Sequence, residues 1–167
     1  IRLSLVGSEM CIRDRAARTP QQANNYFESY QNAIEEVGKI NSSKNLSNGV
    51  SIKISALHPR YEMRKIDQIE SELLPKLSEL VNYAYSKNVE VTIDAEEQDR
   101  LSLSLHIIEK LAYEKNIKDW PGFGIALQAY GKRSFDVVNW LNEVLTKREL
   151  MPVSYTHLRA HETKANL

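Results

Sequence analysis

The 167-residue sequence has one cysteine, Cys11, almost no net charge and no long apolar run. A single cysteine can form neither an internal disulfide nor a multi-cysteine metal cluster, which fits a reducing compartment. A membrane-spanning helix needs roughly 18 or more consecutive apolar residues, and no segment approaches that length. The 22 lysines and arginines balance the 22 aspartates and glutamates, so charge gives no indication of nucleic-acid binding.

Glycine-rich phosphate loops and metal-ligand motifs are also missing. None of the six glycines builds a G-x-G-x-x-G loop after a candidate strand, which argues against a Rossmann dinucleotide domain. His157 and His161 have the spacing of zinc ligands on a helix, but Leu158 stands where the metalloprotease motif carries its glutamate. We therefore expect no metal site.

The two ends of the chain differ from its middle. Residues 1–15 and 151–167 carry no sustained amphipathic period, and both are similar to translated sequencing-adapter read-through at the edges of open reading frames. We expect both to be artefactual tails around a natural segment, residues 16–150. The apolar fraction of 42% and the charged fraction of 26% are those of a soluble globular domain.

Amphipathic spacing predicts helices in the middle of the chain, at residues 19–40, 66–87, 101–112 and from Ser134 onward. The first helix starts with Thr19 as cap, Pro20 in its first position and Gln22 placed to complete a capping box. In the last helix we expect five side chains to face inward: Val137, Val138, Leu141, Val144 and Leu145. Pro75 should kink the second helix or mark its first turn. Residues 41–48 are rich in serine, asparagine and lysine and predict an exposed loop.

Three segments alternate as strands do, starting at Gly49, Val89 and Gly122, and the third is expected to reach Tyr130. In the first segment Val50, Ile52 and Ile54 take one face, and Ser51, Lys53 and Ser55 take the other. The same alternation puts Asp94 and Gln128 in phase with Lys53. The predicted order is a helix followed by three βα units, which is compatible with a parallel barrel or a doubly wound sheet.

If the strands are parallel neighbours, a cation, a carboxylate and an amide meet near their C-terminal ends, where barrels and open α/β sheets place active sites. The alternative is a Lys53–Asp94 salt bridge that merely fills a polar interior. His58 and Arg60 follow the first strand and are further candidates, against the alternative of a solvated turn. Glu96 and Glu97 are expected only to cap and complement the positive N-terminus of the next helix.

Three motifs resemble a known family. They are GVSIKISALHPRY at residues 49–61, TIDAEEQDRL at residues 92–101 and GFGIALQAYGKR at residues 122–133. In this order and spacing they closely resemble the proline dehydrogenase domain of bifunctional bacterial proline utilization A flavoenzymes. The similarity covers about residues 16–150.

This resemblance implies part of a (βα)8 TIM barrel that binds FAD and oxidises L-proline to Δ1-pyrroline-5-carboxylate in proline catabolism to glutamate. It implies that Lys53 contacts the proline carboxylate, that Asp94 lies at the edge of substrate and flavin, and that Gln128 hydrogen-bonds the isoalloxazine ring. A quinone is the implied electron acceptor. The resemblance also implies a complete parent enzyme, of which this chain is a fragment, with a second, NAD-dependent aldehyde dehydrogenase domain. We expect that parent enzyme to be cytoplasmic and to associate peripherally with the inner membrane.

Two alternatives stay open. A lysine inside a barrel strand can form a Schiff base with a carbonyl substrate, as in aldolases and lyases of this fold class. The fragment can also be a non-catalytic structural unit, since it holds three of eight βα units and lacks the family's later flavin and carboxylate contacts.

Overall fold

The computed structural model describes residues 16–44, 48–117, 119–128 and 131–147. Both expected tails lie outside the described residues, and with them Cys11, His157 and His161. The helices and strands are, in chain order, α2 (Pro20–Lys44), β1 (Gly49–Ile52), the 3-10 helices η1 (Ile54–Ala56) and η2 (Met63–Lys65), α3 (Ile66–Ser86), β2 (Glu90–Ile93), α4 (Leu101–Ala112), β3 (Phe123–Ile125) and α5 (Ser134–Lys147).

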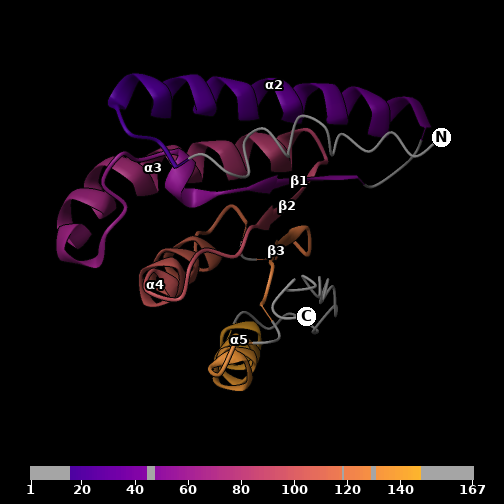
Figure 1. Ribbon diagram of the computed structural model, residues 1–167. Helices are drawn as coiled ribbons and strands as arrows, with labels where there is room; N and C mark the ends of the chain where they lie inside the picture. The colour runs from indigo at the N-terminus through magenta and orange to yellow at the C-terminus, as the bar shows by residue number, and fades with distance from the viewer. Residues whose placement is uncertain (1–15, 45–47, 118, 129–130, 148–167) are drawn as a thin grey trace, which may run out of the picture.

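The strands form one parallel sheet in the order β1-β2-β3, as predicted. Ile52 pairs with Ile93, which in turn pairs with Ile125. A helix follows each strand, and in Figure 1 the helices succeed one another from α2 at the top through α3 and α4 to α5 at the bottom, in the same order as the strands. The chain is therefore an α/β protein with a parallel sheet and sequential βα connections.

One face of the sheet lies in the hydrophobic core. Val50, Ile52, Val91 and Ile93 are buried there, as strand alternation predicts. They belong to one cluster with the apolar stripes of α2, α3 and α4: Tyr30, Ile34, Val37, Ile69, Leu73, Leu77, Leu80, Leu103, Ile107 and Leu111. The opposite face carries the half-buried polar positions of β1 and β2, so the sheet separates a packed side from a polar side.

Helix α2 begins as predicted but ends later. Thr19 Oγ1 accepts a hydrogen bond from Gln22 N, while Gln22 Oε1 reaches back one residue beyond the cap, to Arg18 N. The predicted loop at residues 41–48 is wrong for its first half, because the helix continues to Lys44. Asn41 is buried there, and its side chain bonds the backbone of Asn48 and Asn88. These tertiary partners offset the low helix propensity of asparagine.

Helix α3 decides between the two roles expected for Pro75, and α5 departs from the prediction in detail. Pro75 lies inside α3 and does not mark its first turn. In α5 the buried valines are Val137 and Val144, two turns apart on one face, whereas Val138 is 45% exposed and does not point inward. Leu141 is half-buried, and the side chain of Leu145 lies outside the described residues.

The strands are shorter than predicted, most clearly β1 and β3. β1 ends at Ile52, Lys53 keeps an extended backbone (φ −92°, ψ 114°), and η1 follows at once. The 3-10 turn breaks the period of two, so Ser55 is buried and does not share a face with Lys53. β3 stops at Ile125 and does not run on toward Tyr130, which itself lies outside the described residues.

Candidate functional site

Lys53 and Asp94 lie side by side at the C-terminal edge of the sheet. Each directly follows a paired residue, Ile52 or Ile93, and Asp94 N donates a 2.8 Å hydrogen bond to Ile52 O. On the third strand the corresponding position is Ala126, whose N donates to Ile93 O at 2.8 Å. Gln128, which was expected in phase with Lys53 and Asp94, lies two residues beyond Ala126, after the end of β3.

The polar face of the sheet is open above β3. Lys53, Asp94 and Gly124 are all half-buried, in contrast to the buried residues that alternate with them in β1 and β2. A Cβ placed on Gly124 would meet no atom within 4 Å. The structure therefore leaves space over Gly124, next to Thr92 on β2.

The turn that carries Lys53 is held by distant parts of the chain. Lys53 N donates to the hydroxyl of buried Tyr30 on α2 at 3.0 Å. Ser55 N donates to Glu96 Oε1 at 2.9 Å, and Ser55 O accepts from Ala17 N at 3.0 Å. The alternation of β1 predicted where Lys53 lies, but it gave no signal for these three supports.

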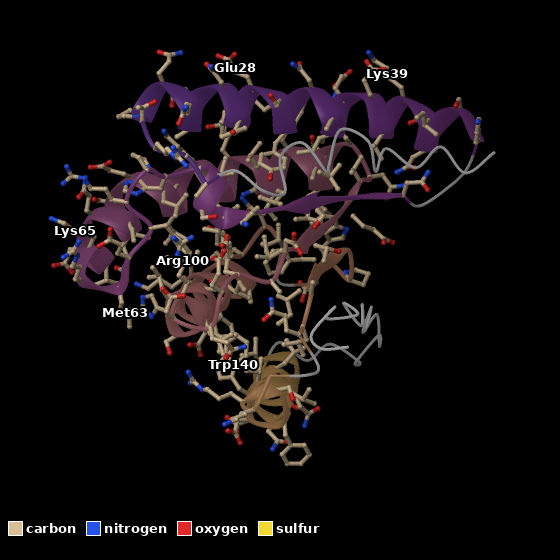
Figure 2. All side chains as sticks on the ribbon, in the orientation of Figure 1. Glu28, Lys39, Met63, Lys65, Arg100 and Trp140 are labelled. Atoms are coloured by element: carbon tan, nitrogen blue, oxygen red, sulfur yellow. The ribbon has the colours of Figure 1, made fainter. Side chains whose placement is uncertain are left out.

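Glu96 is not the simple helix cap that was expected. Glu96 is only 6% exposed, and its Oε1 accepts a hydrogen bond from Ser55 N, in the segment that follows the neighbouring strand β1. Burial raises the pKa of Glu96, an effect opposed by the hydrogen bond from the Ser55 backbone N–H and by the charge of Lys53. The cap of α4 is Arg100, without a side-chain capping bond, and its guanidinium lies 3.7 Å from Glu96 and 3.3 Å from Glu97. Figure 2 shows Arg100 between the turn after β1 and the start of α4.

Gln128 and Asp94 line one narrow cleft of about 40 Å³ between the sheet edge, α4 and α5. Lys53 is not among the lining residues. Gln98 Nε2 donates to Gln128 Oε1 at 3.5 Å, and a Cβ on Gly131 would come within 2.9 Å of the same Gln98 nitrogen. The structure thus brings the carboxylate and the amide together at the cleft, with Gln98 as a neighbour that the sequence did not single out.

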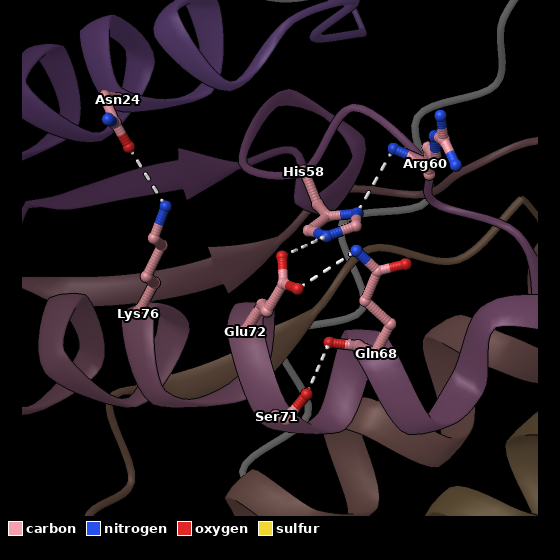
Figure 3. Close-up of polar contacts among 7 residues, drawn as sticks. All are labelled: Asn24, His58, Arg60, Gln68, Ser71, Glu72 and Lys76. Atoms are coloured by element: carbon pink, nitrogen blue, oxygen red, sulfur yellow. Dashed lines mark hydrogen bonds and ion pairs between the residues drawn. The ribbon is translucent and has the colours of Figure 1, made fainter.

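His58 is buried, so the solvated-turn alternative is wrong for it, while Arg60 is exposed. The Nδ1 atom of His58 accepts from Arg60 N at 3.2 Å, and Nε2 lies 3.3 Å from Glu72 Oε2 (Figure 3). Since Nδ1 is an acceptor, Nε2 carries the hydrogen in the neutral ring and donates a hydrogen bond to Glu72 Oε2. Hydrogen bonds from Gln68 and then His58 lower the pKa of Glu72. His58 therefore ties the loop after β1 to α3.

The described part of the chain contains neither a metal-ligand cluster nor a membrane-spanning helix. No group of three or more histidine, cysteine, aspartate or glutamate side chains there is placed to hold a metal ion. None of the described helices is both long and apolar enough to cross a bilayer.

Comparisons with known proteins agree on one family. The proline dehydrogenase family matches residues 6–154, a range that overlaps both expected tails. The bifunctional protein PutA of Escherichia coli strain K12 is 41% identical over 140 residues, which cover 81% of this chain and 11% of PutA. The PutA of Rhizobium meliloti is 38% identical over 131 residues, 78% of this chain and 10% of that protein.

Solved structures give the same answer. A mutant of Bradyrhizobium japonicum proline utilization A aligns with a TM-score of 0.77 at 38% identity, over 81% of this chain and 14% of that one. The chain thus spans about a tenth of the length of its curated relatives. Because the family match runs over most of its residues, the chain belongs to the proline dehydrogenase family.

Proposed function

We propose that residues 16–150 form the N-terminal part of a proline dehydrogenase (βα)8 barrel, flanked by tails at 1–15 and 151–167 that do not belong to it. The complete enzyme would oxidise L-proline to Δ1-pyrroline-5-carboxylate with FAD. The proposal is supported by the family match and by the parallel βα order of the described elements. The observation that carries it is the cation and carboxylate pair, Lys53 and Asp94, at the C-terminal edge of that sheet.

The residues at the sheet edge fit a flavin. An isoalloxazine ring is planar and needs hydrogen-bond donors and acceptors at its rim, and this chain offers the amide of Gln128 and the carboxylate of Asp94 on one cleft. The open space over Gly124 gives room on the adjoining face. Accepting a hydride from C5 of proline is the chemistry that a bound flavin supplies.

The chain's own residues would bind and orient the substrate. The ammonium of Lys53 would pair with the proline carboxylate, which fixes the ring and so turns an encounter into an oriented complex. Asp94, adjacent on β2, would lie at the edge shared by substrate and flavin. Gln128 would hydrogen-bond the flavin ring from the β3 side.

The wider setting is part of the same proposal. A quinone would take the electrons from the flavin, with the parent enzyme in the cytoplasm and peripherally associated with the inner membrane. An aldehyde dehydrogenase domain using NAD would belong to the rest of the parent protein. Its relatives are named bifunctional, which is compatible with a second activity.

The Schiff-base aldolase alternative receives no support from the comparisons. A direct experiment separates the two chemistries in the parent enzyme. Purified protein is assayed for proline-dependent reduction of a quinone analogue and, separately, treated with borohydride in the presence of carbonyl compounds. We expect reduction of the quinone and no adduct at Lys53; an adduct at Lys53 without proline oxidation would overturn the proposal.

A further inference from the structure

The turn that carries Lys53 has little to hold it locally. β1 ends at Ile52, and η1 is a single 3-10 turn of three residues, Ile54–Ala56. Lys53 is its N-cap and makes no side-chain capping bond. Short 3-10 turns have poor hydrogen-bond geometry, so the direction in which Lys53 leaves the sheet depends on contacts from elsewhere.

Glu96 supplies one of these contacts from the neighbouring βα loop. Its side chain is fully buried, and Oε1 accepts from Ser55 N at 2.9 Å, two residues after Lys53. Glu96 itself lies two residues after Asp94. The Glu96 carboxylate therefore joins the segment that follows Lys53 to the segment that follows Asp94.

The surroundings of Glu96 argue against a role in stability alone. Its Oε2 atom and Ser55 Oγ are buried without a hydrogen-bond partner among the described residues, and the Arg100 guanidinium stands 3.7 Å from Oε2. A buried carboxylate with incomplete hydrogen bonding costs stability, and a well-packed apolar side chain of similar volume would often be neutral or better. Perturbed, buried acids of this kind cluster at functional sites.

We propose that Glu96 is a positioning residue, which acts through Ser55 N to hold the Lys53 turn so that the lysine ammonium meets the carboxylate of a small anionic substrate. This inference rests on the proposed function, because it takes Lys53 as the carboxylate-binding group. Glu96 does not touch the substrate. Its contribution is to the affinity for the carboxylate and not to the redox step.

The test uses the complete parent enzyme loaded with flavin. Glu96→Met fills a similar volume without an acceptor, Glu96→Gln keeps an acceptor oxygen, and Glu97→Met is the matched control at an exposed neighbour that also pairs with Arg100. We expect Glu96→Met to raise the KM for L-proline about tenfold, as loss of one oriented charge contact would. The value of kcat per bound flavin should change less than about twofold, and Glu96→Gln and Glu97→Met should stay near the parent in both.

A binding readout separates positioning from general damage. The dissociation constants of cyclopentanecarboxylate and of its neutral carboxamide are measured from changes in flavin absorbance. Glu96→Met should weaken the carboxylate about tenfold and leave the carboxamide unchanged. In a Lys53→Ala background the same substitution should have almost no further effect, because the two residues act as a unit.

The outcomes are distinct. A parent enzyme that does not oxidise proline contradicts the proposed function, whereas an active parent with an unchanged KM in Glu96→Met contradicts only this inference. An equal loss of carboxylate and carboxamide, or a full tenfold effect in the Lys53→Ala background, would also overturn it. If Glu96→Met does not load flavin, Glu96→Asp is measured by the same criteria; loss of flavin in both would make Glu96 a structural residue and refute positioning.

Discussion

Lys53 and Asp94 are neighbours because of the parallel register, which pairs the residues before them, Ile52 and Ile93. The adjoining buried residues on each strand belong to the core, so alternation leaves these two side chains on the polar face. Their opposite charges suggest different roles. A fixed cation suits the binding of a substrate carboxylate, and a carboxylate near the reacting ring suits the orientation of that ring during the reaction.

Asp94→Ala tests that division in the parent enzyme. We expect kcat per flavin to fall about tenfold or more, with a smaller change in the KM for proline. The reason is that the contact made by Asp94 would be stronger in the transition state than in the bound substrate. Steady-state kinetics with proline and a quinone analogue, normalised by flavin absorbance, measure both quantities. A rise in KM with unchanged kcat would assign Asp94 to substrate binding instead.

Glu96 should make stability depend on pH. Burial raises its pKa above the ordinary value of 4.5, so the folded chain holds the proton more tightly than the unfolded chain does. The folded state is therefore favoured at low pH, and this advantage is lost as pH rises through the raised pKa. We expect Glu96→Gln, which cannot ionise, to gain stability relative to the unsubstituted 167-residue chain as pH increases from about 4.5.

Urea unfolding of the 167-residue chain at a series of pH values, followed by tryptophan fluorescence, measures this difference. Glu28→Gln, at an exposed position on α2, is the control. A Glu96→Gln difference that stays constant across the series would show that Glu96 does not hold a raised pKa.

At the scale of elements, the C-terminal end of α2 is fixed by one buried amide. Asn41 Nδ2 donates to the carbonyls of Asn48 and Asn88 at 3.1 and 2.8 Å, and Oδ1 accepts from Asn48 N at 3.0 Å. Asn88 ends the α3–β2 turn with a positive φ of 53°, a conformation that asparagine tolerates. Asn41 thus joins the end of a helix, the start of β1 and the start of β2.

Asn41→Ala should cost about 1–3 kcal/mol, because it removes the hydrogen bonds that this buried side chain makes to the backbone of Asn48 and Asn88. Ser42 is an exposed neighbour, and the free energy of unfolding of Ser42→Ala should stay within about 0.5 kcal/mol of that of the unsubstituted chain. Urea denaturation of both variants gives the comparison. Equal midpoints for the two variants would show that the Asn41 contacts contribute no net stability.

The local sequence pattern predicted which segments are helices and which are strands. It did not predict the contacts that hold the candidate site in place. The apolar spacing of α3 and α4 and the alternation of β1 and β2 predicted the layers and the neighbours Lys53 and Asp94. The helical end of α2 was missed because Asn41 is held by residues distant in sequence. A carboxylate just before a helix commonly caps it, so the sequence alone predicts a cap at Glu96, and only the fold brings its side chain to Ser55 N.

At the scale of the molecule, three parallel strands and their helices present the edge at which Lys53 and Asp94 meet. The chain spans about a tenth of its curated relatives. A ligand pocket that buries most of a cofactor needs walls from several elements, and the cleft at Asp94 and Gln128 measures about 40 Å³. That volume is far below the several hundred Å³ typical of such sites.

The isolated 167-residue chain should therefore neither bind FAD appreciably nor oxidise proline. Flavin absorbance after mixing with FAD and desalting checks the first expectation, and quinone-analogue reduction checks the second. The complete parent enzyme, prepared in the same way, is the control and should do both. Stoichiometric flavin retained by the short chain would contradict this account of the site.

The proposed function assigns Lys53 to the substrate carboxylate in a proline-oxidising flavoenzyme. The most direct measurement is steady-state reduction of a quinone analogue by L-proline, with parallel flavin absorbance, for the complete parent enzyme and its Lys53→Ala variant. Loss of a charge-assisted contact of roughly 1.5–3 kcal/mol predicts a ten- to hundredfold weaker interaction with proline at nearly unchanged flavin content. A variant that loses flavin but binds proline normally would contradict the assignment.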